Sequence, residues 1–409
     1  MADLPTIPMD DPDYWQDPYP ILREIRDRSR LARTPEGIVA VLRWDDAVDA
    51  LKGEDFVAEG VEVLERKGFR PGDPMHTWRK NAIGTMEGAD HRRVRSLAAA
   101  ALSKRRMDGL RPLIRRHANA LLDAKIEAGE LEARLDYALP LPRRVMMDFL
   151  GLAADELASS QKPMAGVNIV DCFGPNVTES LRREANAAIQ ASMDHTARLY
   201  ARRRESPRDD LLTHLVQARD EHGQLSEGEL VTLFSTIFGS GASTASIIAS
   251  GLLELARRPE QAALLRRDPE RWKRGACEET LRYRPAITAV GQKAGSGLRA
   301  FDHEFEAGTP ISVLLGSANR DAAHWEDPER FDLTRDPRKT SLSFGIGPHV
   351  CLGHAMARAT VEEALAVFVE RCDEIEVLGE ARWIPFVMEN KLEGLRLRFR
   401  GREAGGAST

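Results

Sequence analysis

The chain has 409 residues, of which 42% are hydrophobic and 30% are charged, so it is long enough and apolar enough to fold as a globular protein. Its formal net charge of −6 is small for this length and gives no reason to expect a nucleic-acid or anionic-membrane partner. Residues 1–17 are acidic and proline-rich and contain no apolar run typical of a signal peptide or membrane span, so a cytoplasmic protein is expected.

Helical patterns dominate the chain, and three short apolar runs are expected as strands: Gly37–Leu42, Thr309–Leu314 and Leu395–Phe399. Because these runs do not alternate regularly with helices, a mainly α-helical fold with small β-sheets is predicted rather than a doubly wound sheet. No repeat and no shift in composition marks a linker. We therefore expect an N-terminal arm over residues 1–16, one domain over 17–400 and a frayed polar tail over 401–409.

The clearest predicted helix begins at Ser226, which has capping-box spacing to Glu229, and runs to Leu255–Ala256, where Pro259 ends it. A helix of about thirty residues is roughly 45 Å long and would cross the domain. Residues Gly239–Thr244 in its middle are poor helix formers. They form either a packing notch for a flat group or a tolerated weak point. A phosphate loop is disfavoured because the run lacks lysine and lies inside a helix.

The spacing of the cysteines argues against a zinc site or a disulfide framework, since no two are close in sequence among Cys172, Cys277, Cys351 and Cys372. Cys351 alone has unusual surroundings, because it stands in the segment Phe344–Gly353 (FGIGPHVCLG) after two glycines that permit tight turns. An amphipathic helix is predicted after it from apolar residues at i, i+3, i+4 and i+7, namely Val361, Ala364, Leu365 and Phe368.

Cys351 is therefore predicted to lie where a loop meets a helix N-terminus, a place that lowers a thiol pKa and directs N–H groups at the sulfur. Gly353 would let a planar cofactor lie close to the backbone. These features suit the thiolate ligand of an iron porphyrin, because a thiolate pushes electron density onto the iron and favours O–O cleavage. The alternative is a buried structural cysteine, which is the interpretation kept for the other three.

The segment Phe344–Gly353 resembles the haem-binding signature of the cytochrome P-450 family, with Phe344, both glycines, His349, Cys351 and Gly353 in place. Further stretches agree with the family in order: Asp17–Pro20, His91–Arg95, Glu279–Arg282, Ser317–Asp321 and Asp327–Phe331. The resemblance covers roughly residues 17–398. It implies the P-450 fold, a triangular single-domain helical body with the long central helix over the haem.

The resemblance also implies residue roles. Cys351 would hold the iron of haem b, Phe344, Gly345 and Gly353 of the same loop would also bind the cofactor, and the propionates would be bound by His91, Arg95 and His349. His91 and Arg95 are four residues apart and share a helix face, as two donors to one carboxylate should. Glu279 and Arg282 would form a buried charged pair, completed in the family by an arginine that we expect to be Arg330. The alternative for these three is a solvated charged surface.

Two positions depart from the family pattern. The long helix usually carries an acid followed by a threonine, which relay protons to iron-bound dioxygen, but here Ala242 aligns with the acid and Ser243 with the threonine. Gly239 and Ser240 then match the small residues beside bound oxygen, which supports the packing notch. The arginine expected after Pro285 as a propionate partner aligns with Gly291. Either a neighbour substitutes for it, Gln292 or Lys293, or the propionate is held otherwise.

Because alanine cannot transfer a proton, three mechanisms stay open. Waters ordered by Ser243, with Thr244 as a second hydroxyl nearby and with help from a substrate group, carry protons to dioxygen, which is our first choice. Alternatively the enzyme is a peroxygenase, since hydrogen peroxide brings its own protons and electrons. The third option is a non-catalytic haem protein, a ligand sensor or carrier. A slip in the alignment restores no acid, because none lies between Glu229 and Glu254.

Residues expected to face the substrate are mainly apolar, which predicts a small, mainly apolar organic molecule that is hydroxylated or O-dealkylated. They are Phe234 and Phe238 on the long helix, Ile287 and Val290 beside the haem, Phe386 on another wall, and Val170 in a lid at Gly166–Pro175. Plain core packing is the alternative for the helix residues. The resemblance also implies electrons from a ferredoxin-type donor with its reductase. A docking face for that donor would come from Arg92, Arg93, Lys104, Arg105, Arg106, Arg338 and Lys339, for which ordinary solvated charge is an equal alternative.

Overall fold

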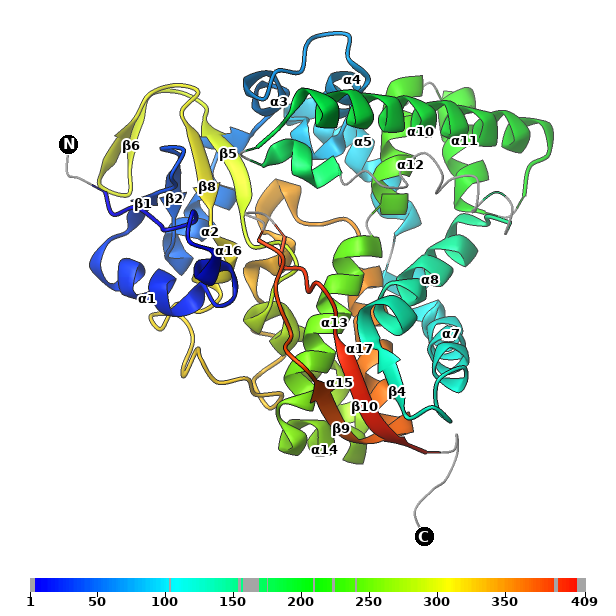
Figure 1. Cartoon of the computed structure of the whole chain (residues 1–409). Helices are drawn as coiled ribbons and strands as arrows, with labels where there is room; N and C mark the ends of the chain where they lie inside the picture. The colour runs from blue at the N-terminus through cyan, green and yellow to red at the C-terminus, as the bar shows by residue number, and fades with distance from the viewer. Residues whose placement is uncertain are drawn as a thin grey trace. The chain divides into compact units, whose positions relative to one another are not determined.

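The structure is a computed structural model (Figure 1) that describes residues 4–402 except 103, 154–155, 157–168, 175, 209, 223–224, 240 and 386–388. The chain is mainly α-helical with small β-sheets, as predicted. Its contacts divide it into two compact units: unit 1 comprises Met1–Phe56, Lys104–Val145 and Gly241–Thr409, and unit 2 comprises Val57–Ser103 and Met146–Ser240. The single domain expected over residues 17–400 stays a prediction.

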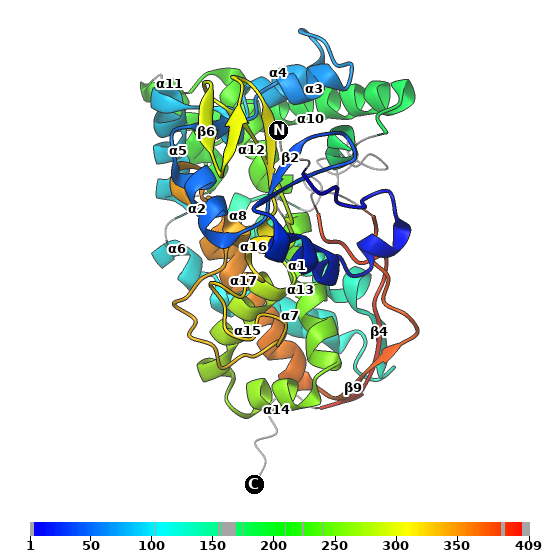
Figure 2. The same ribbon diagram turned by 90° about the vertical axis from the view of Figure 1, so that its left-hand side faces the viewer.

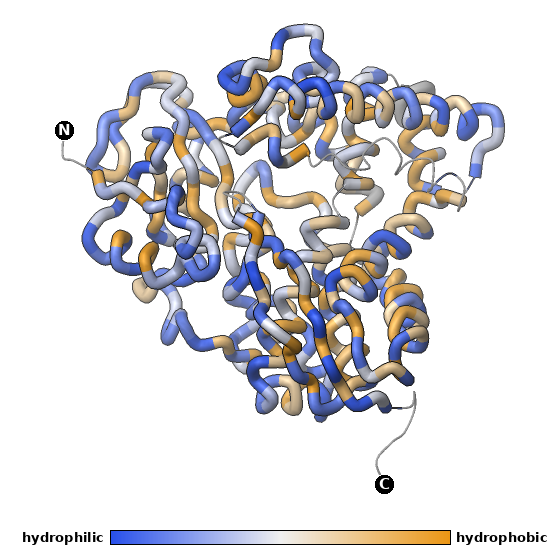
Figure 3. The backbone as a smooth tube through the Cα atoms, viewed as in Figure 1, coloured by the Kyte–Doolittle hydropathy of each residue, from blue (hydrophilic) through white to orange (hydrophobic). Residues whose placement is uncertain are grey.

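Unit 1 is built on a helical core in which α7, α13, α15 and α17 pack together (Figures 1 and 2). Many of the hydrophobic segments in Figure 3 belong to these helices. Gly251 lies where α13 meets two neighbours, because a Cβ there would come within 2.9 Å of the Leu365 side chain and 3.1 Å of Thr280 Oγ1. The helices of this unit are α1 (Tyr19–Arg28), α2 (Trp44–Lys52), α6 (Lys104–Gly109), α7 (Arg111–Asp123), α13 (Gly241–Ala256), α14 (Pro259–Arg267), α15 (Pro269–Tyr283), α16 (Leu315–Ala318) and α17 (His354–Arg371).

The predicted strands all form, and they pair within unit 1. The first sheet contains the order β1 (Leu31–Arg33), β2 (Val39–Val41), β8 (Pro310–Val313) and β5 (Val290–Ala294), with β2 and β8 parallel. The second sheet is antiparallel in the order β4 (Glu130–Glu132), β10 (Arg396–Gly401) and β9 (Cys372–Leu378). Strands β6 (Leu298–Ala300) and β7 (His303–Phe305) form a short antiparallel ribbon. Strand β3 (Phe56–Ala58) begins at Phe56, the last residue of the first segment of unit 1.

Two predictions about the C-terminal part are corrected. The helix after Cys351 is not amphipathic, because α17 is buried on all sides and includes the buried acids Glu362 and Glu363. Glu363 tolerates burial since it accepts hydrogen bonds from Arg111 at 2.9 Å, Arg115 at 3.0 Å and Lys273 at 2.9 Å. The polar tail does not begin at residue 401, because Gly401 pairs with Cys372 in the sheet; residues 403–409 lie outside the described chain.

Unit 2 is helical, and its elements are α3 (Glu62–Arg66), α4 (Pro74–Lys80), α5 (Gly88–Ala101), a 3-10 turn at Ile169–Phe173, α10 (Glu179–Glu205), α11 (Leu211–His222) and α12 (Glu227–Gly239). Helix α8 (Pro140–Leu150) continues from unit 1 into unit 2. The buried guanidinium of Arg203 binds Asp210 at 2.8 Å, Glu156 at 3.0 Å and the carbonyl of Gly151 at 2.8 Å. This network ties the end of α10 to the segments on either side of it.

The predicted central helix occupies Glu227–Ala256 as α12 and α13, with Ser240 between them outside the described residues. Its capping box forms, because Glu229 N donates to Ser226 Oγ at 3.2 Å and Ser226 N donates to Glu229 Oε2 at 2.7 Å. Within the described chain this 30-residue span is the one helical stretch long and apolar enough to cross a membrane, and 53% of its most apolar window is buried. A core helix has the same composition, and Thr244–Leu255 of α13 are buried within the fold.

Candidate active site

The loop before Cys351 has a backbone that requires glycine at two positions. Gly345 and Gly347 have φ values of 68° and 79°, a left-handed conformation that strains other residues. At Gly347 a side chain also has no room, since a Cβ would lie 2.7 Å from the carbonyl oxygen of Leu51. The N–H of Cys351 donates to the carbonyl of Phe344 at 2.8 Å and closes the loop. The predicted tight turn is therefore confirmed.

Cys351 is the exposed member of the four cysteines, whereas the other three are buried. Burial raises the pKa of the Cys172 thiol to about 11 and that of Cys372 to about 12, and it also raises the pKa of Cys277. These three thiols are therefore neutral and enclosed near neutral pH. Helix α17 begins at His354, just after Cys351, so the cysteine lies at the predicted loop-to-helix junction.

These residues fit a flat iron-containing cofactor. The Cys351 thiol is exposed, and a Cβ added at Gly353 would meet Cys351 Sγ at 3.9 Å and no other described atom within 4 Å. The backbone beside the sulfur is therefore bare enough for a planar ring to approach. Sulfur is a suitable axial ligand for haem iron, and the glycines supply the close approach that the macrocycle needs.

The ring of Phe344 is fixed by α17, which the sequence did not indicate. The guanidinium of Arg358 lies 4.6 Å from the ring centroid, and the His354 ring centroid lies 6.2 Å away. Arg358 is itself bound to Glu278 of α15 at 2.5 Å and to His354 Nδ1 at 3.1 Å. The loop is thus held at its first residue by side chains from two core helices. An arginine on the helix after a cysteine loop is the only signal in the sequence that could have suggested this contact.

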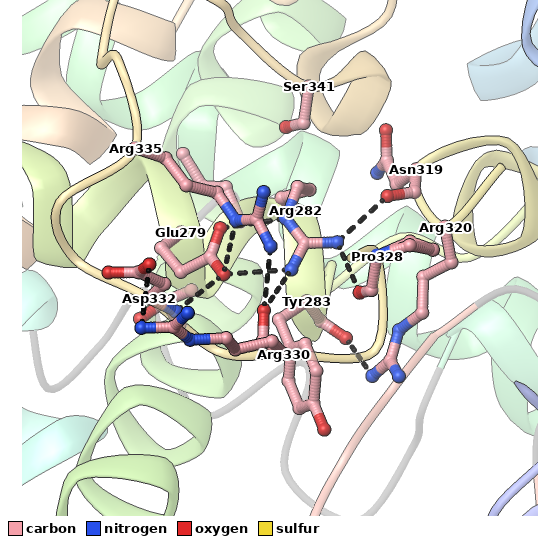
Figure 4. A network of polar contacts seen from close by, with 12 residues as sticks. Glu279, Arg282, Tyr283, Asn319, Arg320, Pro328, Arg330, Asp332, Arg335 and Ser341 are labelled. Carbon is pink, nitrogen blue, oxygen red and sulfur yellow. Dashed lines mark hydrogen bonds and ion pairs between the residues drawn. The ribbon is translucent and has the colours of Figure 1, made fainter. Parts of the chain in front are cut away.

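Glu279 and Arg282 form the predicted buried pair (Figure 4). Two hydrogen bonds of 2.7 and 2.8 Å join the guanidinium to the carboxylate, and both side chains are almost fully enclosed. The remaining N–H groups of Arg282 donate to the carbonyls of Asn319, Pro328 and Arg330. A buried ion pair needs such additional partners to offset the loss of hydration.

The prediction that Arg330 completes this pair is wrong. Its side chain is 65% exposed and contacts Asp332, and only its carbonyl oxygen enters the network. The third member is Arg335, which is 19% exposed and donates to Glu279 Oε1 at 3.2 Å (Figure 4). Arg335 also binds the carbonyls of Glu326, Asp327 and Arg330, so the irregular segment folds around this guanidinium.

A hydrogen-bond chain connects the pair to the cysteine loop. Asn319, whose carbonyl binds Arg282, donates from its side chain to Ser343 Oγ at 2.9 Å and accepts from Leu342 N at 2.8 Å. Ser343 Oγ in turn donates to the carbonyl of Leu281 at 2.6 Å. The residues that lead into Phe344 are therefore anchored to α15 beside the ion pair. Sequence reasoning did not identify Asn319 or Ser343 as supports of the loop.

The first turn of α13 carries hydroxyls but no acid. Ala242 is exposed, Ser243 is half-buried and Thr244 is buried. The next carboxylate along α13 is Glu254, which is bound by Arg284 at 3.1 Å and by Arg258. The departure from the family pattern is thus present in the structure, and Ser243 is the partly accessible hydroxyl of this turn.

Gly291, which stands where the family has a propionate-binding arginine, lies in strand β5. Side chains alternate along a strand, so Lys293 shares a face with Gly291, whereas the buried Gln292 points to the opposite face. Ile287 and Val290 are partly buried and pack at the edge of an apolar cluster in unit 1. Of the two residues considered as substitutes for the missing arginine, Lys293 is therefore the one on the same strand face as Gly291.

The other predicted haem contacts belong to different units. His91 is buried and Arg95 half-buried one turn apart on α5 in unit 2, while His349 belongs to unit 1. Their joint binding of propionates stays a prediction. Two members of the predicted basic docking face have acidic partners: Arg93 binds Glu229 at 2.6 Å, and Arg338 binds Asp336 at 2.8 Å.

The predicted substrate contacts in unit 2 are only partly described. Phe234 is buried between Phe238, whose ring centroid is 6.1 Å away and nearly parallel, and Tyr200. This packing favours the core alternative for Phe234, whereas Phe238 is half-buried at the end of α12. The side chain of Val170 lies outside the described residues, as does Phe386 of the other wall.

Comparison with known proteins identifies the family. The model of the cytochrome P450 family matches residues 274–381. Cytochrome P450 107B1 of Saccharopolyspora erythraea is 31% identical over 384 residues, which cover 90% of this chain and 91% of that protein. Cytochrome P450 monooxygenase PikC of Streptomyces venezuelae is 30% identical over 96% of this chain and 94% of its own. The solved structure of epothilone B-bound cytochrome P450epoK has a TM-score of 0.88 at 26% identity and covers 96% of this chain and 99% of that one. The chain is therefore a member of the cytochrome P450 family, a haem-dependent monooxygenase with that family's fold.

Proposed function

We propose that this chain uses haem b and dioxygen to hydroxylate or O-dealkylate a small, mainly apolar organic substrate. The observation that carries the proposal is the exposed Cys351 thiol at the end of a glycine-built loop that is anchored to the buried Glu279–Arg282 pair. When bound, haem supplies the redox chemistry that reduces and cleaves dioxygen. Cys351 would hold its iron, and Phe344, Gly345 and Gly353 would shape the loop around the sulfur.

The side chains proposed to hold the propionates are His91, Arg95, His349 and Lys293. Each is a nitrogen donor, and a charge-assisted hydrogen bond to a carboxylate is among the stronger polar contacts in proteins. Lys293 is included because it shares a strand face with Gly291, where the family's arginine is missing. Lys293 would thus supply the positive charge from a position two residues further along β5.

In the first turn of α13, hydroxyl groups rather than an acid would order the water that carries protons. Ser243 can donate one hydrogen bond and order a water molecule, and Thr244 adds a second hydroxyl on the same turn. Protons would therefore arrive through water held at Ser243. Ala242 contributes small size at this turn and no proton.

The substrate would contact apolar side chains, for which Phe238, Ile287 and Val290 are the described candidates. Relatives support an organic substrate of this kind, since one solved neighbour is named for bound epothilone B. We further propose a ferredoxin-type electron donor with its reductase, docking on the basic residues around Arg92 and Lys339, and a cytoplasmic location. Strong dependence of electron transfer on ionic strength is expected from such docking.

Peroxide use is the second candidate, and the alanine at position 242 favours it. Hydrogen peroxide already contains the protons and electrons that the dioxygen route must collect. A chain without an acid at position 242 would lose less on that route than on the dioxygen route.

One experiment separates these functions. The purified haem-loaded protein is reduced under carbon monoxide, and its absorption spectrum is compared with that of Cys351→Ala; the thiolate-type spectrum is expected only for the wild type. Substrate-like compounds are then screened by spin-state shift, and products are measured with a ferredoxin electron chain or with peroxide alone. Product only with electrons supports the proposal, product only with peroxide supports the second candidate, and no product by either route supports a non-catalytic haem protein.

A further inference from the structure

Helix α13 carries a buried hydroxyl, that of Ser246, one turn beyond Ser243. This hydroxyl contacts the buried carboxyl of Glu389, which comes from another part of the chain. Ser246 Oγ donates to Glu389 Oε1 at 3.5 Å, and the two residues are only 9% and 8% exposed. Residues three apart on a helix share a face and have Cβ atoms about 5–6 Å apart. Ser246 therefore contacts the carboxyl of Glu389 and shares a helix face with Ser243, one turn away.

The backbone holds Glu389 firmly at this place. Glu389 forms an antiparallel bridge with Ile287, and the N–H of Asn390 donates to the carbonyl of Ala286 at 2.7 Å. A second bridge pairs Trp383 with Leu392 on the same turn of chain. The carboxyl thus comes from a segment distant in sequence but fixed beside α13 within unit 1.

Glu389 also lines a small cavity. Its volume is about 50 Å³, and Thr288, Tyr19 and Trp383 line it together with Glu389. Tyr19 is 3% exposed, and its hydroxyl has no hydrogen-bond partner among the described residues. A buried hydroxyl normally has a partner, and this mainly apolar cavity has room for one water molecule, which would find polar partners at Tyr19, Thr288 and Glu389. The cavity thus has room for a water molecule beside Glu389.

We propose that Glu389 provides the proton-carrying group that α13 lacks at position 242, an inference that rests on the proposed function. When Glu389 is protonated the hydrogen bond to Ser246 reverses, and the carboxyl passes its proton to Ser246 Oγ, which releases its own proton toward the water at Ser243. A proton from bulk solvent, relayed by a water in the cavity, then returns to the carboxylate, so charge balances and no electron moves in this step. Glu389 acts through Ser246 and does not touch the reacting atoms. Glu254, the other nearby buried acid, is unsuitable because Arg258 and Arg284 bind it.

The first test uses infrared spectra of the purified protein at neutral pH in H₂O and in D₂O. A protonated carboxyl band that shifts in D₂O is expected, and Glu389→Gln should lose it. Glu380→Gln is the matched control, because Glu380 is an exposed carboxylate of the same segment paired with Arg382 and its loss should leave the band unchanged. Absence of a Glu389 band, or a band that does not respond to D₂O, would overturn the proposal.

The second test measures product formed per electron consumed, with 7-ethoxycoumarin as an O-dealkylation probe. In Glu389→Gln this ratio should fall about tenfold and the solvent deuterium isotope effect should rise, because removing a general acid slows proton transfer. Glu389→Asp should restore part of the loss, and the double variant with Ser246→Ala should be no worse than either single variant, since both interrupt one path. Peroxide-driven product should not change.

The outcomes distinguish this inference from the proposed function. A wild type that makes no product with electrons defeats the proposed function, and the infrared test still decides whether Glu389 carries a proton. A wild type that makes product while Glu389→Gln keeps its ratio and isotope effect defeats only the proposed role of Glu389. If Glu389→Gln loses the thiolate spectrum, Glu389→Asp and Ser246→Ala replace it in the test. An unchanged isotope effect in these two variants would contradict the proposal.

Discussion

Arg335 donates a hydrogen bond to Glu279 at 3.2 Å and so completes the buried charged pair from outside α15. The carboxylate also accepts from Asp332 N at 2.8 Å and from Arg282 at 2.7 and 2.8 Å. One acid therefore organises a helix and the irregular segment that follows α16. Because Asn319 joins this segment to Leu342 and Ser343, the network supports the loop that carries Cys351.

Arg335→Ala is expected to lower the free energy of unfolding by about 2 kcal/mol, because it removes one charged partner of a buried carboxylate and leaves three carbonyls short of a donor. Haem retention should fall as well, since the cysteine loop loses part of its support. Urea denaturation and the haem-to-protein ratio measure the two effects.

Arg330→Ala is the matched control for this prediction. Its guanidinium is exposed and only its carbonyl enters the network, so a change below about 0.5 kcal/mol is expected. If the two variants lose equal stability, the assignment of Arg335 as the third member is incorrect.

The contrast between these two arginines shows what a sequence reveals about this fold. Glu279 and Arg282 were predictable because helix spacing alone puts them on one face. The position of Arg335 depends on backbone carbonyls of an irregular segment, and no spacing rule gives their direction. The burial of Glu363 in α17 was missed for a similar reason, because its partners Arg111 and Lys273 are far from it in sequence.

The cysteine loop was predictable for the opposite reason. Its conformation depends on glycines that lie within a few residues of Cys351, so local sequence specifies it. The pair of Ser246 and Glu389 is separated by 143 residues and could be found only in the folded chain. Local sequence therefore indicated the proposed iron ligand, whereas the residues that support its loop and the proposed proton-carrying groups could be found only in the tertiary structure.

Gly347→Ala should destabilise the loop more than Gly345→Ala. Both positions have positive φ, and holding an alanine in such a sparsely populated conformation costs about 1–3 kcal/mol. At Gly347 the added methyl group would also lie 2.7 Å from the carbonyl of Leu51, whereas at Gly345 its nearest neighbour would be 3.9 Å away. The loop around Cys351 must therefore shift in the first variant.

Two measurements check this difference: thermal unfolding of the haem-loaded protein, and the rate at which a thiol reagent labels the haem-free protein. Cys351 should account for the rapid labelling in the wild type, because the other three thiols are buried and neutral. Gly347→Ala should change that rate and Gly345→Ala should change it less. Equal effects would mean that conformation at the two glycines, and not space beside Leu51, limits the loop.

Glu156 is expected to stabilise unit 2 at neutral pH and to lose this effect in acid. Its pKa is lowered to about 2, because hydrogen bonds and charge from Arg203 outweigh the opposing effect of burial. A carboxyl with a lowered folded-state pKa contributes stability above its unfolded value, near 4.3, and loses it as pH falls toward 2. The contribution at pH 7 is up to about 3 kcal/mol.

Urea denaturation of the wild type and Glu156→Gln at pH 7 and at pH 3 measures this contribution. The gap between the two proteins should be widest at pH 7 and should narrow at pH 3, inside the window between the two pKa values. Glu179→Gln offers a control, since Glu179 is an exposed acid at the start of α10 that lies 3.7 Å from Arg182. A gap that is constant from pH 7 to pH 3 would show that Glu156 acts by packing and not by its charge.

Ser243→Ala is expected to reduce the product formed per electron when the enzyme works with dioxygen, and to raise the peroxide released. The half-buried hydroxyl is the group that would order a proton-carrying water next to Ala242, and alanine cannot replace it. Ala242→Glu is the complementary change, because it puts an acid where the family has one and should raise the same ratio. Both variants should keep the thiolate spectrum, since neither position belongs to the cysteine loop.

With peroxide as oxidant, Ser243→Ala should form product at the wild-type rate. An unchanged ratio in Ser243→Ala with dioxygen would remove this hydroxyl from the proton path, and a gain in Ala242→Glu alongside it would place the limiting proton step at position 242 alone.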